Sequence, residues 1–298
     1  MQTITLNNGV EMPILGLGTM RVKNLEEVIP AAIEAGYRLI DTAANYDNEQ
    51  EVGAAIKNSG IDRAELFITS KMQILSRGEN TRLAVESSLR NLGLEYIDLY
   101  LIHQPYGDIY GEWRELEKLH KEGKLRAIGV SNFEPFRLMD LMLHNEIKPA
   151  VNQIEVHPWC QMQKEHEFHL THGIRTEAWA PFAENKNELF SQPVLTELAA
   201  KYGKNVQQII LRWVTQRGIV AIPRTTNAVH AKANMQIFDF QLEDSEMELI
   251  RAMDTGKTLF LDHLDPEIVK TLSTVVASPI EVGDKRPSHD EWARQRAE

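Results

Sequence analysis

Eight short apolar segments recur along this chain, and the stretches between them have the spacing of amphipathic helices. The apolar segments lie at residues 14–18, 38–41, 66–71, 97–103, 125–130, 150–153, 174–179 and 219–222. Strands that alternate with helices predict a parallel sheet covered by helices, and eight strands suit a closed barrel. We therefore predict an α/β fold, the (β/α)8 TIM barrel, with an open doubly wound sheet as the alternative.

Two of the helical stretches carry end signals. In 205–214 the apolar residues follow the spacing of one helix face, and Asn205 stands at the N-cap position. In 81–92 the apolar spacing ends at Leu92, and Gly93 supplies a C-terminal stop. Both stretches are predicted to be helices.

The two ends of the chain lie outside this alternation. Around Asn8 and Gly9, apolar and polar residues alternate, which predicts an N-terminal β-hairpin. From about Ala277 the chain is polar and punctuated by prolines, which predicts a C-terminal loop or tail wrapped over the barrel. Because no linker, repeat or low-complexity stretch marks a boundary, we predict a single domain over residues 1–298.

Composition excludes several classes of partner. The formal net charge of −11 argues against broad binding to nucleic acid or an anionic membrane. The lone cysteine, Cys160, excludes an intramolecular disulfide and fits a reducing compartment. The first residues have no signal-peptide pattern, and no apolar run approaches the ~20 residues of a membrane span. We expect a cytoplasmic protein.

Three titratable residues end three successive predicted strands: Asp41, Lys71 and His103. Taken alone, each has an ordinary explanation as a cap, a solvated charge or the start of a turn. Together they converge, because the carboxyl ends of barrel strands meet on the face where active sites lie. Tyr46, five residues after Asp41, belongs to the same group.

These four side chains suit proton donation to a carbonyl oxygen. Tyrosine has an ordinary pKa near ~10, and a neighbouring ammonium is expected to lower it. Asp41 would hold the lysine in position and His103 would orient the substrate oxygen, so this chemistry requires no metal.

Two other patterns carry less weight. The turn at Gly16–Leu17–Gly18 lacks the third glycine of a Rossmann fingerprint. The histidines His166, His169 and His172 recur every third residue of a predicted helix. They fit either a metal site or, as we prefer, a solvated polar face.

At these residues the chain resembles the aldo-keto reductases, in particular the bacterial branch that includes diketogluconate reductases. The segments that carry the resemblance are GLGTM, YRLIDTAANYDNEQEVGAAI, LFITSK, LGLEYIDLYLIHQP, GKLRAIGVSNF, VNQIEVHP and IPRTTNAVHAKAN. The resemblance implies the barrel fold and a catalytic tetrad of Asp41, Tyr46, Lys71 and His103.

The resemblance also implies a nicotinamide cofactor lying extended across the barrel mouth. Nicotinamide contacts would come from Ser131, Asn132 and Gln153, with Trp179 stacked on the ring, and the adenosine phosphate would lie along residues 223–234. The full set of implied cofactor contacts is Gly18, Thr19, Met20, Asp41, Ser131, Asn132, Gln153, Trp179, Ala180, Pro181, Ile222, Pro223, Arg224, Thr225, Thr226, His230 and Asn234.

The chain departs from the common pattern of that family at both ends of the predicted site. In the substrate pocket, predicted to comprise Met20, Tyr46, His103 and Gln104, Met20 and Gln104 replace the usual aromatic residues. At the adenosine end, Arg224, His230 and Ala233 replace a usual lysine, arginine and glutamate. We expect NADPH as the preferred cofactor, with NADH also used.

The leading functional hypothesis is therefore an NAD(P)H-dependent reductase of aldehydes or ketones, including keto sugars and dicarbonyls, which acts as a monomer on small molecules. One alternative is a nicotinamide-binding regulatory subunit with slow turnover. The other is a barrel isomerase or hydrolase without nicotinamide.

Overall fold

The computed structural model describes residues 2–72 and 80–275. Its strands are β1 (Thr3–Thr5), β2 (Glu11–Pro13), β3 (Gly16–Gly18), β4 (Leu39–Asp41), β5 (Phe67–Lys71), β6 (Ile97–Ile102), β7 (Leu125–Ser131), β8 (Val151–Glu155), β9 (Arg175–Trp179) and β10 (Val220–Ala221). Its helices are α1 (Leu25–Glu34), α2 (Glu49–Ser59), α3 (Thr81–Leu92), α4 (Ile109–Lys121), α5 (Pro135–Leu143), α6 (Gln163–His172), α7 (Pro193–Tyr202), α8 (Val206–Gln216), α9 (Ala228–Met235), α10 (Asp244–Arg251) and α11 (Pro266–Val275). Short irregular helices in the described ranges include η1 (Ala44–Tyr46), η2 (Arg63–Glu65) and η4 (Ala183–Ser191).

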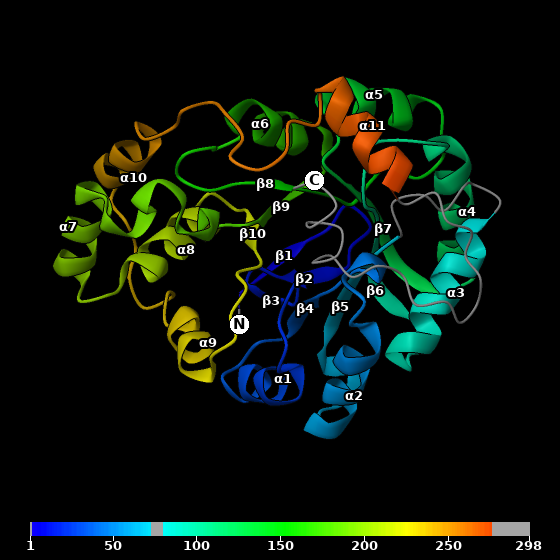
Figure 1. The fold of residues 1–298 in the computed structure, drawn as a ribbon, viewed down its shortest axis with the longest axis horizontal. Helices are drawn as coiled ribbons and strands as arrows, with labels where there is room; N and C mark the ends of the chain where they lie inside the picture. Colours follow the sequence, from blue (N-terminus) through cyan, green and yellow to red (C-terminus); the bar gives the residue numbers. More distant parts are fainter. Residues whose placement is uncertain (1, 73–79, 276–298) are drawn as a thin grey trace.

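The eight strands from β3 to β10 form one parallel sheet in sequence order, and the helices surround it (Figure 1). Its two edge strands meet, because Ala221 N donates to Ile14 O (3.0 Å) and Gly18 N donates to Pro223 O (3.1 Å). At this seam a Cβ on residue 18 would lie 2.9 Å from Ile222 O, so only glycine fits there. All eight predicted strands and the barrel are confirmed, and the open sheet is excluded.

Two apolar layers hold the barrel. The inner layer fills the barrel with alternate strand residues such as Leu39, Leu99 and Val220, and Leu6 and Met12 of the hairpin join it. The outer layer packs the opposite strand faces against the helices. The side chains of a strand alternate between the two layers, which is why these strands read as nearly continuous apolar runs.

The predicted helix ends are present. Asn205 Oδ1 accepts from Gln208 N and Gln208 Oε1 accepts from Asn205 N, a capping box that starts α8. Gly93 ends α3 in the left-handed conformation. The short hairpin of β1 and β2 is also confirmed.

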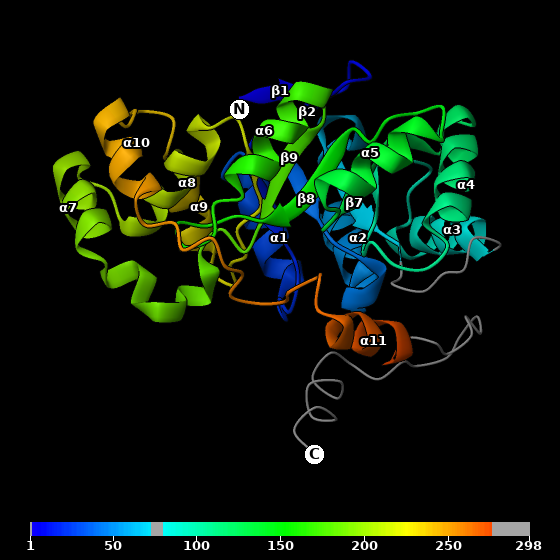
Figure 2. The ribbon, with the colours of Figure 1, turned by 90° about the horizontal axis from the view of Figure 1, so that it is seen from above.

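The two ends of the barrel are closed differently. Figure 2 shows β1 and β2 on one side of the barrel and α11 on the opposite side. The tail predicted from Ala277 lies outside the described residues, so its course and the single-domain prediction over 1–298 stay predictions. Within the described ranges, no helix is long and apolar enough to cross a membrane.

Candidate active site

The ends of β4, β5 and β6 bring four predicted side chains together. Asp41 ends β4 and Lys71 ends β5, His103 follows β6, and η1 carries Tyr46 back over them. The rings of Tyr46 and His103 meet edge to face, with centroids 5.9 Å apart.

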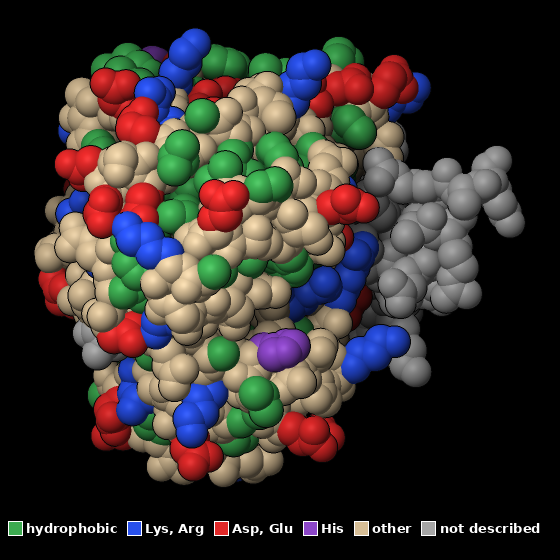
Figure 3. All heavy atoms as spheres, turned by 90° about the vertical axis from the view of Figure 1, so that its left-hand side faces the viewer, with side chains coloured by type: hydrophobic (Ala, Val, Ile, Leu, Met, Phe, Trp, Pro, Cys, Tyr) green, Lys and Arg blue, Asp and Glu red, His purple; other side chains and the backbone are tan. Residues whose placement is uncertain are grey.

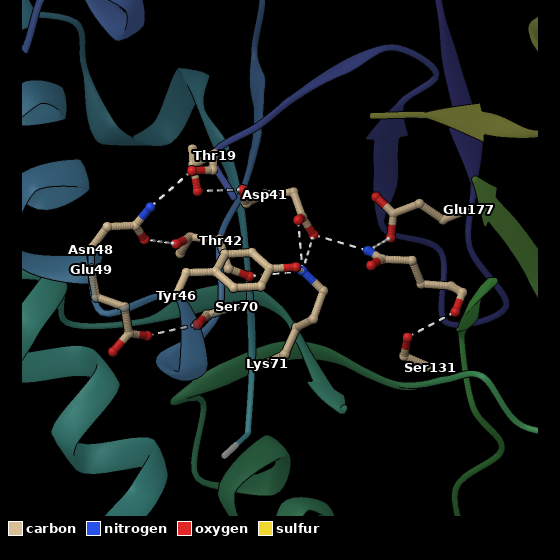
Figure 4. A network of polar contacts seen from close by, with 11 residues as sticks. Thr19, Asp41, Thr42, Tyr46, Asn48, Glu49, Ser70, Lys71, Ser131 and Glu177 are labelled. Atoms are coloured by element: carbon tan, nitrogen blue, oxygen red, sulfur yellow. Dashed lines mark hydrogen bonds and ion pairs between the residues drawn. The ribbon is translucent and has the colours of Figure 1, made fainter. Parts of the chain in front are cut away.

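Lys71 is the centre of this cluster. Its buried Nζ donates to Asp41 Oδ1 (2.6 Å), Asp41 Oδ2 (2.8 Å) and Thr42 O (2.9 Å). It also lies 3.3 Å from the Tyr46 hydroxyl oxygen. Figure 4 shows the lysine reaching between Asp41 and Tyr46. The ammonium is thus fixed on one side by a carboxylate and aimed on the other at the phenol.

The electrostatics of the cluster differ in one respect from expectation. We predicted that Lys71 lowers the pKa of Tyr46 below its ordinary value, and this is wrong in direction. Burial raises the pKa of Tyr46, and the opposing effect of the ammonium is smaller. For Lys71, burial acts to lower the pKa, but the negative charges of Asp41 and Tyr46 outweigh burial, and the pKa rises to about 12.

His103 is uncharged at neutral pH. Burial, and then the Lys71 ammonium, lower its pKa to about 3. Its Nδ1 is buried and has no hydrogen-bond partner among the residues described. A neutral imidazole can donate a hydrogen bond to a carbonyl oxygen but is a poor proton source, so the phenol of Tyr46 is the candidate acid of the cluster.

A second layer of polar side chains, which the sequence analysis missed, holds the η1 loop. Thr42 Oγ1 donates to Asn48 Oδ1 (2.7 Å), and Asn48 Nδ2 donates to Thr19 O (2.9 Å). On the next strand, Ser70 Oγ donates to Glu49 Oε1 (2.7 Å). These residues are all buried. Their signal in the sequence was a dense run of polar residues, DTAANYDNEQE, directly after a strand.

The residues predicted to contact nicotinamide also meet. Ser131 Oγ and Asn132 N both donate to Gln153 O, at 2.8 and 2.9 Å. Trp179 Nε1 donates to Asn132 Oδ1 (2.8 Å). Asn132 takes the left-handed conformation, with φ of 62°, which asparagine tolerates better than most residues. Gln153 Nε2 reaches Asp41, so this group adjoins the lysine cluster.

The adenosine end of the predicted site is hollow. A cavity of about 280 Å³ is lined by Phe182, Phe190, Asn205, Gln207, Arg224, Thr225, His230, Ala233 and Asn234. Arg224 contacts Met20 O (3.4 Å) and Glu184 (3.6 Å), and its side chain is 37% exposed. A guanidinium, two aromatic rings and hydroxyl and amide groups around one hollow fit the phosphate and the base of a nucleotide.

The surroundings of this hollow are mixed in charge. The helices that line it lie on the left of Figure 1, and Figure 3 looks onto that side, where acidic and basic side chains are interspersed. Anion binding there therefore depends on local groups such as Arg224 rather than on a broad basic surface.

The other predicted cofactor residues lie along the barrel rim. Gly18, Ile222 and Pro223 form the β3–β10 seam, with Met20 and Thr226 just beyond it, and Ala180 and Pro181 follow β9. Thr19 is fully buried; its hydroxyl and its backbone N–H both donate to Asp41 O (2.9 and 3.0 Å), so these groups are used within the fold, and the ligand contact expected of Thr19 stays a prediction.

The predicted substrate pocket contains Gln104, which the sequence analysis named, and lies near a segment that the sequence analysis missed. Gln104 is nearly buried, and its Oε1 accepts from Asn132 Nδ2 (3.4 Å). Asn132 also lines a small cavity of about 30 Å³, together with residues that include Trp179, Leu261 and His263. The last two residues come from the segment between α10 and α11, for which the sequence analysis had no signal.

The histidines of α6 are not on a solvated face, contrary to our preference. His166 and His169 are buried, and their Nδ1 atoms lie 2.8 and 2.9 Å from the hydroxyl of Thr176. His169 Nε2 accepts from Asn152 Nδ2 (2.9 Å). The histidines instead pack α6 against the barrel wall, because polar partners on β8 and β9 satisfy their rings. The described residues contain no group of three or more His, Cys, Asp or Glu side chains arranged to hold a metal.

The strand ends of this parallel eight-stranded barrel hold a buried lysine–carboxylate pair, a tyrosine and a neutral histidine, and a hollow beside Arg224 offers groups that fit part of a nucleotide. These features are typical of one class of protein, the barrel oxidoreductases. Comparison with known proteins agrees. The model of the aldo/keto reductase family matches residues 14–255. The chain belongs to the aldo/keto reductase family.

Curated relatives are similar over most of their length. The chain is 48% identical to glyoxal reductase of Bacillus subtilis over 257 residues, which cover 85% of this chain and 92% of that protein. It is 43% identical to methylglyoxal reductase of Escherichia coli, covering 86% of this chain and 94% of that protein.

Solved structures agree on the fold. An aldo-keto reductase from a deep-sea metagenome library has a TM-score of 0.85 and 42% identity, covering 88% of this chain and 98% of that one. An aldo-keto reductase of Bombyx mori in complex with NADP has a TM-score of 0.83 and 34% identity, covering 90% and 96%. The protein is an oxidoreductase that carries out NAD(P)H-dependent carbonyl reduction.

Proposed function

We propose that Tyr46 is the proton donor in this reduction. The observation that carries the proposal is the contact of 3.3 Å between the Lys71 ammonium and the Tyr46 hydroxyl, with Asp41 fixing the lysine from the other side. The bound cofactor supplies hydride to the carbonyl carbon. Tyr46 gives its proton to the carbonyl oxygen, and His103, as a neutral imidazole, donates a hydrogen bond that orients that oxygen.

The raised pKa of Tyr46 is compatible with this role. The oxygen that receives the proton becomes an alkoxide as hydride arrives, and an alkoxide is far more basic than a phenolate. The transfer is therefore downhill even from a weakened acid. Lys71 acts by stabilising the phenolate that is left behind.

NADPH is the proposed preferred cofactor. Ser131, Asn132, Gln153 and Trp179 would hold the nicotinamide end, and Arg224, Thr225, His230 and Asn234 the adenosine end. The guanidinium of Arg224 suits a 2′-phosphate, because it forms paired charge-assisted hydrogen bonds. An NADP-bound relative supports this assignment.

Small dicarbonyl compounds are the proposed substrates. Two similar relatives are named for glyoxal and methylglyoxal. The side chain at 104 is an amide rather than an aromatic ring, and it can donate to a second carbonyl oxygen.

A reductase screen tests the cofactor and substrate proposals together. Glyoxal, methylglyoxal, a matched monoaldehyde and a keto sugar are each assayed with NADPH and with NADH. We expect the highest kcat/KM for a dicarbonyl with NADPH. A higher value for the monoaldehyde would overturn the substrate proposal, and preference for NADH would overturn the cofactor proposal.

A further inference from the structure

Glu177 is a buried acid in the barrel that the proposed reaction does not use. It lies on β9 and is fully buried. Its Oε2 accepts from Gln153 Nε2 (2.8 Å), and its Oε1, also buried, has no hydrogen-bond partner within residues 2–72 and 80–275. A buried carboxylate without a cation and with a bare oxygen is costly, so the geometry favours a neutral acid.

The amide of Gln153 links this acid to the lysine cluster. Its Nε2 donates to Asp41 Oδ2 (2.9 Å) as well as to Glu177 Oε2 (2.8 Å). Two carboxyl groups on one nitrogen fix which way the amide faces, since only the NH2 group can donate to both. The amide oxygen, Oε1, is then the atom left to accept from a ligand.

The charges around the carboxyl groups of Asp41 and Glu177 indicate which of the two carries a proton. Gln153 Nε2 lies 2.9 Å from Asp41 Oδ2 and 2.8 Å from Glu177 Oε2, so the two carboxyl groups are close together. The cation beside them is the Lys71 ammonium, which bonds to Asp41. Burial raises the pKa of Asp41 as well, but the Lys71 ammonium bonds to both of its oxygens and opposes that rise, so the geometry assigns the negative charge to Asp41. Burial, and then the neighbouring Asp41 charge, raise the pKa of Glu177 to about 8.

We propose that Glu177 is a positioning residue that carries a proton at neutral pH: it fixes the Gln153 amide with its oxygen free for the nicotinamide carboxamide, and it leaves Asp41–Lys71 as the one charged pair beneath Tyr46. This inference rests on the proposed function for the identity of the ligand and of the acid. It adds to that function a residue that touches neither the substrate nor the cofactor.

Loss of the proton has a defined consequence. Above pH 8 an ionised Glu177 faces Asp41, Lys71 and Tyr46 across Gln153. Its charge raises the pKa of Tyr46 and so weakens the proton donor. Reduction should therefore decline as the pH rises through about 8. Removing the ionisable group should remove this alkaline decline.

The first experiment observes the proton directly in the protein without cofactor. Infrared spectra of wild type and Glu177→Gln, recorded from pH 6 to pH 10, are compared in the region of the protonated carboxyl band. We expect a band at pH 7 that the variant lacks and that titrates near pH 8. Glu112 on α4, whose pKa burial and Asp108 raise to about 9, gives an internal reference present in both proteins. No difference between the two spectra at pH 7 would overturn the proposal.

The second experiment separates positioning from general damage. Glu177→Leu removes the acceptor and should weaken NADPH binding, measured by fluorescence titration, roughly tenfold. Glu177→Gln keeps an acceptor oxygen and should bind within about twofold of wild type. Thr69→Val, which removes a buried hydroxyl from β5, is the matched control and should leave NADPH binding unchanged. Equal affinity in wild type and Glu177→Leu would overturn the positioning role.

The pH profile of kcat/KM completes the test. The alkaline limb should be present in wild type and Thr69→Val and absent in Glu177→Gln, and its persistence in Glu177→Gln would overturn the proposal. If wild type reduced no carbonyl, the proposed function would fail, while the infrared and binding results would still decide the role of Glu177.

Discussion

The two ends of the proposed cofactor site are built in opposite ways. At the nicotinamide end, Lys71 is fully buried and has three acceptor contacts between 2.6 and 2.9 Å. At the adenosine end, Arg224 is 37% exposed and has two contacts, at 3.4 and 3.6 Å. The first cation is held in place by the fold, and the second is free to change partners.

The backbone conformation also differs between the adenosine end and the nicotinamide end. Beside Arg224, η4 contains five non-glycine residues with positive φ: Ala183, Glu184, Asn185, Asn187 and Glu188. Each such non-glycine residue costs about 1 kcal/mol or more. Asp41 and Lys71 instead end regular strands, and the η1 loop that carries Tyr46 is braced by Thr42 and Asn48. The proposed chemistry therefore lies where side chains are fixed by buried hydrogen bonds, and the proposed choice of cofactor where the cation is exposed.

The sharpest test of the nicotinamide end is Tyr46→Phe, for which we expect the largest effect. The ring stays and the acid is lost, so NADPH affinity should remain near wild type while kcat falls by ~10²–10⁴-fold. Single-turnover oxidation of bound NADPH by methylglyoxal measures the step. Retention of a third of wild-type kcat would rule out Tyr46 as proton donor.

The next test breaks the buried ion pair from each side. Lys71→Met removes the charge that stabilises the phenolate and should lower kcat by roughly 10–10³-fold. Asp41→Asn leaves the ammonium present but less well held, so its loss of kcat should be smaller. Each change leaves a buried charge without its partner and should cost ~3–5 kcal/mol of unfolding free energy, measured with urea.

Lys118→Met, which breaks the exposed pair with Glu115, is the control for this test and should change neither quantity measurably. A greater loss of kcat for Asp41→Asn than for Lys71→Met would reverse the proposed roles.

Much of the lysine cluster at the nicotinamide end was predictable from the sequence. The period of the apolar segments gave the strands, and the barrel then placed Asp41, Lys71 and His103 on one face because they end consecutive strands. Sequence order could not give the direction of the Tyr46 pKa. That direction depends on how far burial outweighs one ammonium, which is a property of the packed site.

Residues with partners far along the chain were missed for a related reason. Glu177 and Gln153 face each other because β8 and β9 pair in one register, and nothing near residue 177 in the sequence indicates that contact. His166 and His169 were assigned to solvent because their spacing resembles a polar helix face. Their partners, Thr176 and Asn152, become neighbours only when α6 packs on the barrel.

The adenosine end is tested by His230→Arg. His230 is exposed on α9 and lines the adenosine hollow. A guanidinium is always charged and can form two parallel hydrogen bonds to a phosphate, which an imidazole cannot. One added charge-assisted bond to a 2′-phosphate should raise the NADPH/NADH ratio of kcat/KM roughly ten- to a hundredfold.

A matched control sharpens this prediction. His144→Arg, at the exposed end of α5, makes the same change far along the chain and should leave the ratio unchanged. An NADH preference in wild type would mean that Arg224 does not meet the phosphate.

The smallest expected effect lies between the two ends, at Gln104. Its Oε1 accepts from Asn132, which is itself held by Trp179 and by the backbone of Gln153, so losing Gln104 should leave NADPH affinity within about twofold. Gln104→Trp removes the amide and adds a rigid ring, and Gln104→Leu removes the amide at similar size. If the amide recognises a second carbonyl, both variants should lower the ratio of kcat/KM for methylglyoxal to that for a monoaldehyde by up to about tenfold. A fall in Gln104→Trp alone would mean that bulk rather than hydrogen bonding sets the preference. An unchanged ranking in both would mean that Gln104 only fills space, and the selectivity of the pocket would then have to come from the segment that carries Leu261 and His263.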